Sequence, residues 1–297
     1  MNDSDFEIEN HVLIGYRKAF SSEYQKIVTI PEGVTAIGRS AFICCEGIES
    51  IEIPEGVVSI GESAFYFCEN LKSVTLPRSL RVIELCAFEQ CRNLKYFQIP
   101  DSVSPQSIGW NAFRGVSSSP ESYPDGFIIH QNTLVQYTGN AREIIIPPEV
   151  RKIRDHVRLC RMTESVVIPE TVEKMTMRLF EDIENLKFLS IYHMQVNMKM
   201  PEFQKAFLLF RAVRNIINHQ ENPEDLQFLK ENINLLLWIE TEPFRKILNT
   251  GKVFTQENIN PVIRLANQEQ CYEKQILLIN YKYQHFDFNQ TGENLKL

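Results

Sequence analysis

Long apolar segments are missing from this 297-residue sequence. The densest apolar run, Ile233–Ile239, falls far short of the ~20 residues that a membrane helix requires. The first residues, Met1–Asp5, include acidic side chains where a secretory signal would carry basic ones before an apolar stretch. We therefore expect a cytoplasmic chain without membrane insertion. The alternative is a cell-surface location, which requires that a leader was removed.

Motifs of catalysis and metal binding are also missing. The seven cysteines include no CxxC pair, and their odd number does not fit a closed disulfide framework. The six histidines form no HExxH motif, and the sequence has no P-loop, no G-x-G-x-x-G turn and no G-x-S-x-G elbow. We expect no enzyme, no cofactor and no bound metal.

Basic residues are too few for a nucleic-acid-binding protein. There are 31 of them against 38 acidic residues, which gives a formal net charge of −7. Binding to phosphate backbones needs clustered Lys and Arg, so a nucleic-acid partner is not expected. Hydrophobic residues make up 43% of the chain, which excludes wholesale disorder and provides cores for roughly two domains.

The sequence does contain an internal repeat with a step of 23 residues. An aliphatic residue precedes proline at Ile30-Pro31, Ile53-Pro54, Leu76-Pro77 and Ile99-Pro100. Further columns keep the same step: Ile37, Ile60 and Ile83; Ala41-Phe42, Ala64-Phe65 and Ala87-Phe88; Cys45, Cys68 and Cys91. One unit alone buries too little apolar surface, whereas stacked units share a continuous core. The repeat therefore predicts a solenoid.

Each unit is expected to start with a short strand. Alternation of inward and outward residues predicts parallel strands at Ile51–Ile53, Val74–Leu76 and Phe97–Ile99, each ended by proline. The stretch that follows has three- and four-residue spacing, which predicts a turn and then one or two helical turns.

Equal positions in the repeat should stack on one another. Phe42, Phe65, Phe88 and Phe113 are therefore expected to form a buried row. Cys45, Cys68 and Cys91 should lie near the ~4.8 Å spacing of neighbouring strands. We expect these thiols to pack as small hydrophobic groups rather than to form disulfides or bind metal.

The pattern I-P … I-G … A-F … C … L … I resembles the BspA-like leucine-rich-repeat family. Ile37-Gly38, Ile60-Gly61 and Ile108-Gly109 match its I-G element, whereas Ile83-Glu84 departs from it. The resemblance covers about residues 6–191. It implies a right-handed leucine-rich-repeat solenoid and a binding or adhesion module of the kind often found on bacterial surfaces.

The chain divides into five segments. Residues 1–26 are a β-hairpin lead-in, 27–116 hold four units, 117–143 a turn-rich loop and a second hairpin, 144–195 two degenerate units, and 200–288 a helical domain. The hairpins are predicted because Phe6, Ile8, Leu13 and Tyr16 have the same spacing as Phe127, Ile129, Leu134 and Tyr137. The fold class is thus an α+β repeat solenoid with hairpin insertions, followed by an all-α region.

The last segment is expected to be helical because its apolar residues recur every three or four positions. Helices are predicted at 203–217, 225–238, 242–249, 255–267 and 271–286, with Thr255 and Asn258 as a cap and Gly251 as a helix stop. These short helices resemble ankyrin-type repeats, although the ankyrin T-P-L-H element is absent. The region is expected to cap the open end of the solenoid.

The outward side chains of the strands are the first candidate site. On the concave face of the solenoid they include Glu49, Glu52, Lys72, Thr75, Lys95, Tyr96 and Gln98. A mixed-charge surface with an exposed aromatic residue is typical of protein recognition. The alternative for each residue is an ordinary solvated sheet surface.

A basic stretch is the second candidate site, consisting of Arg151, Lys152, Arg154, Arg158 and Arg161. It could bind an acidic partner or the acidic first units of another copy, since residues 1–71 contain 12 acidic and 4 basic side chains. The alternative is the solvated edge of a degenerate unit. A monomer is favoured, because a head-to-tail contact does not close on itself.

These features together predict a non-catalytic scaffold that binds a protein partner of unknown identity. Two alternatives stay open. One is a bacterial surface adhesin, and the other is an enzyme or enzyme regulator with a site where the solenoid meets the helices.

Overall fold

The computed structural model describes residues 5–17, 26–116, 126–184, 186–192, 194–195 and 205–287. Two units can be distinguished in it. Unit 1 comprises Met1–Glu143, Pro148–Thr163 and Lys174–Asn185, and unit 2 comprises Ile144–Pro147, Glu164–Glu173 and Leu186–Leu297. The chain forms a β-solenoid of about seven coils followed by helices, so the fold class predicted from the sequence is confirmed.

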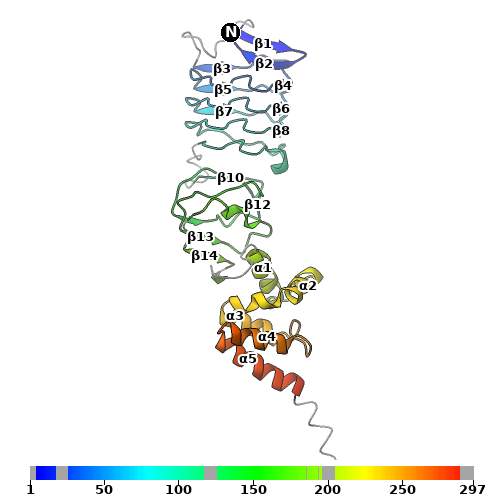
Figure 1. The fold of residues 1–297 in the computed structure, drawn as a ribbon. Helices are drawn as coiled ribbons and strands as arrows, with labels where there is room; N and C mark the ends of the chain where they lie inside the picture. Colours follow the sequence, from blue (N-terminus) through cyan, green and yellow to red (C-terminus); the bar gives the residue numbers. More distant parts are fainter. Residues whose placement is uncertain are drawn as a thin grey trace, which may run out of the picture. The chain divides into compact units, whose positions relative to one another are not determined.

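Each of the first three coils of the first block contributes one strand to each of two sheets (Figure 1). The fourth coil joins them only through single bridges, Ser73 with Tyr96 and Ile83 with Ile108. One sheet consists of β3 (Ile27–Thr29), β5 (Ser50–Glu52) and β7 (Ser73–Thr75). The other consists of β1 (Phe6–Glu9), β2 (Val12–Tyr16), β4 (Ala36–Ile37), β6 (Ser59–Ile60) and β8 (Val82–Ile83). The coils pair in parallel at the repeat step, as in Ile51 with Val74 and Ile37 with Ile60. The predicted stacking of equal positions is therefore confirmed.

The helical turns expected after each proline are wrong. Residues of that stretch form β4, β6 and β8, and the backbone then turns with left-handed residues such as Ser63 (φ 56°) and Phe67 (φ 59°). This geometry directs alternate N–H groups along the stack. Ser63 donates to Leu85 O at 2.9 Å, and Phe67 donates to Glu89 O at 2.9 Å. A helix would consume these donors within its own coil, whereas here they join neighbouring coils.

The third predicted strand is also wrong in its extent. Pairing with β7 stops at a single bridge between Ser73 and Tyr96, and Phe97–Ile99 is not a strand. Phe97 has the position that smaller aliphatic residues have in earlier coils, and its ring stacks on Phe113 with 5.1 Å between centroids. The larger side chain thus leaves the regular column. The two preceding strands begin one residue earlier than predicted.

A row of buried phenylalanines forms the centre of the first block. The ring centroids lie 5.0 Å apart for Phe42 and Phe65, 4.9 Å for Phe65 and Phe88, and 5.6 Å for Phe88 and Phe113. All four side chains are almost fully buried, as the repeat predicts. Tyr16 continues the row at 5.4 Å from Phe42.

Steric contact between coils explains the glycine at Gly61 and Gly109 of the I-G element. A Cβ added to Gly61 would lie 2.9 Å from Ile37 O in the preceding coil, and one added to Gly109 would lie 2.3 Å from the backbone carbon of Glu84. Real Cβ atoms essentially never approach so closely, so successive coils can stack tightly here only without a side chain.

Both predicted hairpins are present. β1 pairs with β2, and β9 (Phe127–His130) pairs with β10 (Thr133–Tyr137), each antiparallel. The second strand of each hairpin then pairs in parallel with a strand of the first coil of the block that follows, β2 with β4 and β10 with β12 (Lys152–Ile153). Most of the turn-rich loop predicted before the second hairpin lies outside the described residues.

The second block ends in a four-stranded sheet. Its order is β11 (Glu143–Ile145), β13 (Ser165–Ile168), β14 (Phe188–Ile191) and β15 (Met194–Gln195). β13 and β14 are parallel, whereas β15 returns antiparallel to β14. Short 3-10 turns, η2 (Pro105–Ser107) and η3 (Met177–Phe180), occur in the coils.

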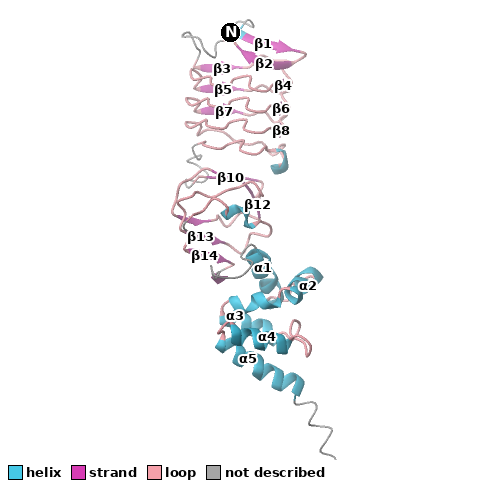
Figure 2. Cartoon of the chain, in the orientation of Figure 1, coloured by secondary structure: helices cyan, strands magenta, loops and turns pink. Residues whose placement is uncertain are grey.

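Residues 205–287 of unit 2 are mainly helical (Figure 2). The helices are α1 (Ala206–Ile217), α2 (Pro223–Glu231), the 3-10 helix η5 (Ile233–Trp238), α3 (Thr241–Asn249), α4 (Ile259–Gln268), α5 (Tyr272–Lys282) and the π-helical turn η6 (Tyr283–Asp287). The single helix predicted at 225–238 is wrong, because α2 ends before Asn232. That residue has non-helical dihedrals, and its side-chain amide donates to Phe228 O at 2.9 Å. The first residues of the helix predicted from 203 lie outside the described part.

Helix α1 packs on the last coil of the solenoid within unit 2. The rings of Tyr192 and Phe207 lie 5.8 Å apart, and the guanidinium of Arg214 lies 4.2 Å from the Tyr192 ring centroid. Arg214 also donates to Glu170 O at 2.6 Å. Side chains of this contact therefore cover part of the coil end that would otherwise face solvent.

Candidate functional site

The outward side chains of β3, β5, β7 and the segment 95–98 form one surface, called here the strand face. Its side chains stand in three columns at the repeat step: Lys26, Glu49, Lys72 and Lys95; Ile27, Ser50, Ser73 and Tyr96; Thr29, Glu52, Thr75 and Gln98. All seven residues predicted for the first candidate site belong to these columns. Within the strands, Glu52 and Thr75 point outward because Ile51 and Val74, which alternate with such positions, are buried in the core. Glu49 and Lys72 lie directly before β5 and β7.

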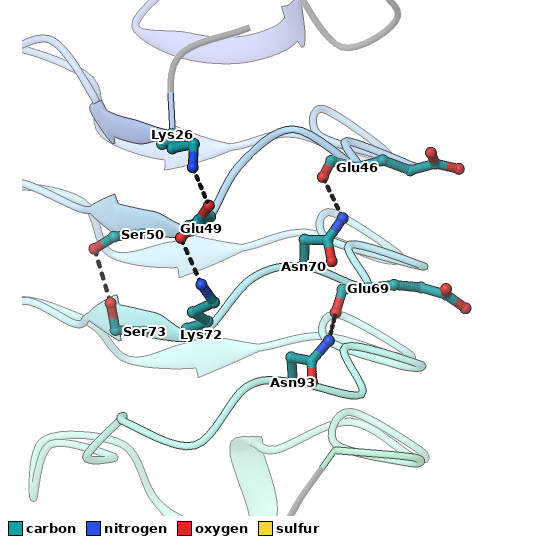
Figure 3. A network of polar contacts seen from close by, with 9 residues as sticks. All are labelled: Lys26, Glu46, Glu49, Ser50, Glu69, Asn70, Lys72, Ser73 and Asn93. Atoms are coloured by element: carbon teal, nitrogen blue, oxygen red, sulfur yellow. Dashed lines mark hydrogen bonds and ion pairs between the residues drawn. The ribbon is translucent and has the colours of Figure 1, made fainter.

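The first column is a chain of ion pairs (Figure 3). Glu49 Oε1 lies 3.0 Å from Lys26 Nζ, and Glu49 Oε2 lies 2.6 Å from Lys72 Nζ. The two ammonium groups donate to the carboxylate and hold the pKa of Glu49 below its ordinary value, Lys72 having the larger effect. Glu49 and Lys72 thus neutralise each other within the chain.

Neighbouring polar side chains also join the coils. Ser73 Oγ and Ser50 Oγ are hydrogen-bonded at 2.8 Å, and the side-chain amides of Asn70 and Asn93 donate to Glu46 O and Glu69 O at 2.8 Å each (Figure 3). Sequence reasoning missed these contacts. The sequence does contain an indication of the asparagine contacts, because Asn70 and Asn93 occupy the same position of the repeat.

The remaining residues of the strand face are not used in this way. In the part of the chain that the structure describes, the side chains of Glu52, Thr75, Lys95, Tyr96 and Gln98 have no hydrogen bond or ion pair with another side chain or backbone group. Tyr96 is 58% exposed. The strand face thus ends, at its last coil, in an aromatic ring beside a cation and a carboxamide.

The side chains of the basic stretch differ in exposure. Arg151 and Lys152 are exposed. Arg154 is partly buried and donates to Ile108 O at 2.5 Å, and this burial lowers its pKa. Arg158 pairs with Glu181 at 3.0 Å, and Arg161 with Glu184 at 3.7 Å. Arg154, Arg158 and Arg161 therefore already have partners within the chain.

One exposed aromatic residue escaped the sequence reasoning. Trp110 is 54% exposed, and its ring lies 6.2 Å from that of His156. It follows Gly109 of the I-G element, in the column of the repeat that holds Arg39, Glu62 and Leu85. An aromatic residue at a position that is charged in the first two coils was the available signal.

The three stacked cysteines are buried, as expected for packing. The thiols of Cys68 and Cys91 donate to Phe42 O and Phe65 O, each at 3.0 Å. Burial raises the pKa of Cys91 well above its ordinary value. Burial and a hydrogen bond with Glu89 raise the pKa of Cys86 to about 12. The raised pKa values keep Cys86 and Cys91 in the thiol form at neutral pH.

Two further properties concern only the residues that the structure describes. They include no group of three or more His, Cys, Asp or Glu side chains that could hold a metal ion. None of their helices is long and apolar enough to cross a membrane.

The repeat columns and inter-coil pairings agree with a family match. The family described as BspA type Leucine rich repeat region matches residues 2–118 and 102–206, with six copies of the repeat. These residues make up more than half of the chain.

The chain belongs to the BspA-type leucine-rich-repeat family. The match ends where α1 begins, so the ankyrin-like character of the helices stays a prediction. No curated protein resembles this BspA-type chain closely enough to count as a match.

Solved structures of leucine-rich-repeat proteins are similar to the BspA-type chain. A protein from Bacteroides ovatus is 28% identical with a TM-score of 0.38, over 62% of this chain and 44% of its own. One from Bacteroides capillosus is 32% identical with a TM-score of 0.29, over 38% of this chain and 92% of its own. The T. pallidum leucine-rich-repeat protein is 19% identical with a TM-score of 0.38, over 71% and 95%. The chain thus spans less than half the length of the B. ovatus protein.

Proposed function

We propose that this BspA-type chain is a non-catalytic binding protein that takes up a protein partner on its strand face. The observation that carries the proposal is the exposed ring of Tyr96, next to Lys95 and Gln98, whose side chains have no partner among the described residues. Exposed tyrosines supply much of the contact energy in protein interfaces, because the ring buries apolar area and the hydroxyl still forms a hydrogen bond.

The paired residues of the strand face have a different role in this proposal. Glu49 and Lys72 form an ion pair with each other across neighbouring coils. A rigid backbone loses little conformational entropy when a partner binds. The contacts with a partner therefore come from Glu52, Thr75, Lys95, Tyr96 and Gln98. The ion-paired side chains of the first column contact one another instead.

The two alternatives fare differently. A cell-surface adhesin would use the same strand face, so labelling of intact cells with an antibody against the chain distinguishes the locations. A catalytic site at the end of the solenoid has less support, since Tyr192, Phe207 and Arg214 fill that contact with one another.

The test is partner capture with the full chain as bait, from cells that express it natively. The variant Lys95→Ala/Tyr96→Ala should lose the captured partner and keep its melting temperature, because both side chains are exposed. Trp110→Ala is the matched control, since Trp110 is similarly exposed on the same unit. Retained capture by the double variant, together with loss in the control, would move the binding surface to Trp110.

A further inference from the structure

Helix α5 has apolar side chains on two opposite faces. Leu278 and Tyr281 are buried on the inner face, where the Tyr281 ring lies 6.4 Å from that of Phe254. The outer face carries Tyr272, Ile276, Ile279 and, in the following turn, Tyr283, each between 46% and 58% exposed. A surface helix normally has one apolar face. The second face indicates a further contact.

The outer residues have the spacing of a helix–helix seam. Steps of four, three and four residues separate Tyr272, Ile276, Ile279 and Tyr283, which is the alternation of a and d positions in a coiled coil. The steps read the same in both directions along the helix. A face of this kind matches its own reversed copy, as a contact across a two-fold axis requires.

The charges at the two ends of α5 favour the reversed arrangement. Glu273 lies in its first turn and Lys282 in its last. Lys274, which also lies in the first turn, is partly buried and donates to Leu237 O at 2.8 Å, so Glu273 is the exposed charge of that turn. Antiparallel pairing brings the acidic turn of one helix to the level of the basic turn of the other, and it also opposes the two helix dipoles. Parallel pairing would bring like charges to the same level.

We propose that the outer face of α5 binds the same face of α5 in a second copy of the chain, antiparallel, around the midpoint between Leu277 and Leu278. Tyr272 then lies at the level of Tyr283 of the second copy, and Ile276 at the level of Ile279. The sequence alone favours a monomer. A contact of four side chains per helix is small, and interfaces below about 1,000 Å² form weakly and transiently. The dimer should therefore appear only at high protein concentration.

The experiment is sedimentation velocity of the full chain from micromolar to millimolar concentration. The native chain should shift from monomer towards dimer, and Ile276→Ser/Ile279→Ser should stay monomeric over the whole range. Ile145→Ser is the matched control, because Ile145 on β11 is 68% exposed and lies off this helix. A native monomer at every concentration overturns the proposal, as does a dimer that the α5 variant leaves unchanged.

Disulfide trapping tests the direction. In a Cys271→Ser background, chains with Tyr272→Cys mixed with chains with Tyr283→Cys should cross-link, while neither alone should. Eleven residues of helix separate equal positions by about 16 Å in an antiparallel pair. Cross-linking of each variant with itself shows parallel pairing and overturns the antiparallel assignment. A chain that ends at residue 287 and dimerises where the full chain does not would instead assign the face to residues 288–297.

Discussion

Lys72 Nζ lies 2.6 Å from Glu49 Oε2, one repeat earlier in the chain. The same step joins Lys187 with Glu164 at 2.8 Å and Arg39 with Glu62 at 3.0 Å. Opposite charges at one position of successive coils therefore act between coils. They add side-chain contacts to the parallel backbone ladder and leave fewer free charges for a partner.

The Glu49 ion pairs predict a pH-dependent stability. The folded-state pKa of Glu49 is lowered, chiefly by Lys72, so its contribution is complete above the unfolded value of about 4.3 and is lost as pH falls through the lower folded value. Glu49→Gln should lower the melting temperature at pH 7 and lower it less at pH 3. Glu52→Gln serves as control, with the same small effect at both pH values. An equal loss at both pH values for Glu49→Gln would exclude the ion pairs as the cause.

The stacked phenylalanines predict a large cost of truncation. Phe88→Ala should lower the free energy of unfolding by about 3–5 kcal/mol, because the fully buried ring leaves a cavity between Phe65 and Phe113. Urea unfolding followed by circular dichroism measures it. Phe188→Ala, at a partly exposed strand position, should cost much less. A loss below about 1 kcal/mol for Phe88→Ala would contradict close packing of the row.

Ser63 lies in the left-handed turn that follows β6, called here a left-handed corner. Its positive φ predicts different effects of two substitutions at this residue. Ser63→Val should destabilise by about 1–2 kcal/mol, since a left-handed conformation is costly for a β-branched residue. Ser63→Gly should be neutral or up to about 1 kcal/mol more stable, because glycine adopts this conformation freely but loses more entropy on folding. Ser59→Val in β6 is the control and should change stability little. Equal effects of valine and glycine at Ser63 would show that φ is not the determinant.

The sequence was sufficient for features that depend on the repeat step. The burial of Phe88 and the outward direction of Tyr96 both follow from equal spacing and alternation. The conformation of Ser63 does not, because nothing in a serine signals φ > 0. It is determined by the carbonyl of Leu85 in the next coil, which accepts the Ser63 N–H. Alternation and spacing also predict that Lys72 lies on the candidate surface. They do not predict its ion pair with Glu49, which depends on the conformations of both side chains.

The helical region was less predictable, because its elements are short and not repeated. Apolar spacing continues through Asn232, and the end of α2 depends on the side chain of that residue bonding back to Phe228. The pair Thr255 and Asn258 was recognisable, and the two residues hydrogen-bond each other directly before α4 begins. Local polar chemistry, rather than hydrophobic period, thus fixes these boundaries.

The left-handed corners form one column of hydrogen bonds with its own electrical direction, while other bonds between coils, such as Gly61 N–H to Ile37 O, run the opposite way. At each corner, N–H groups point towards the following coil and carbonyls towards the preceding one, as in Phe42 to Ala64, Phe65 to Ala87 and Phe88 to Ala112. Peptide dipoles aligned in this way add up, much as they do along a helix. The column therefore carries partial negative charge at its first coil and partial positive charge at its last. Its two ends are chemically different, and a coil can be added only in one orientation.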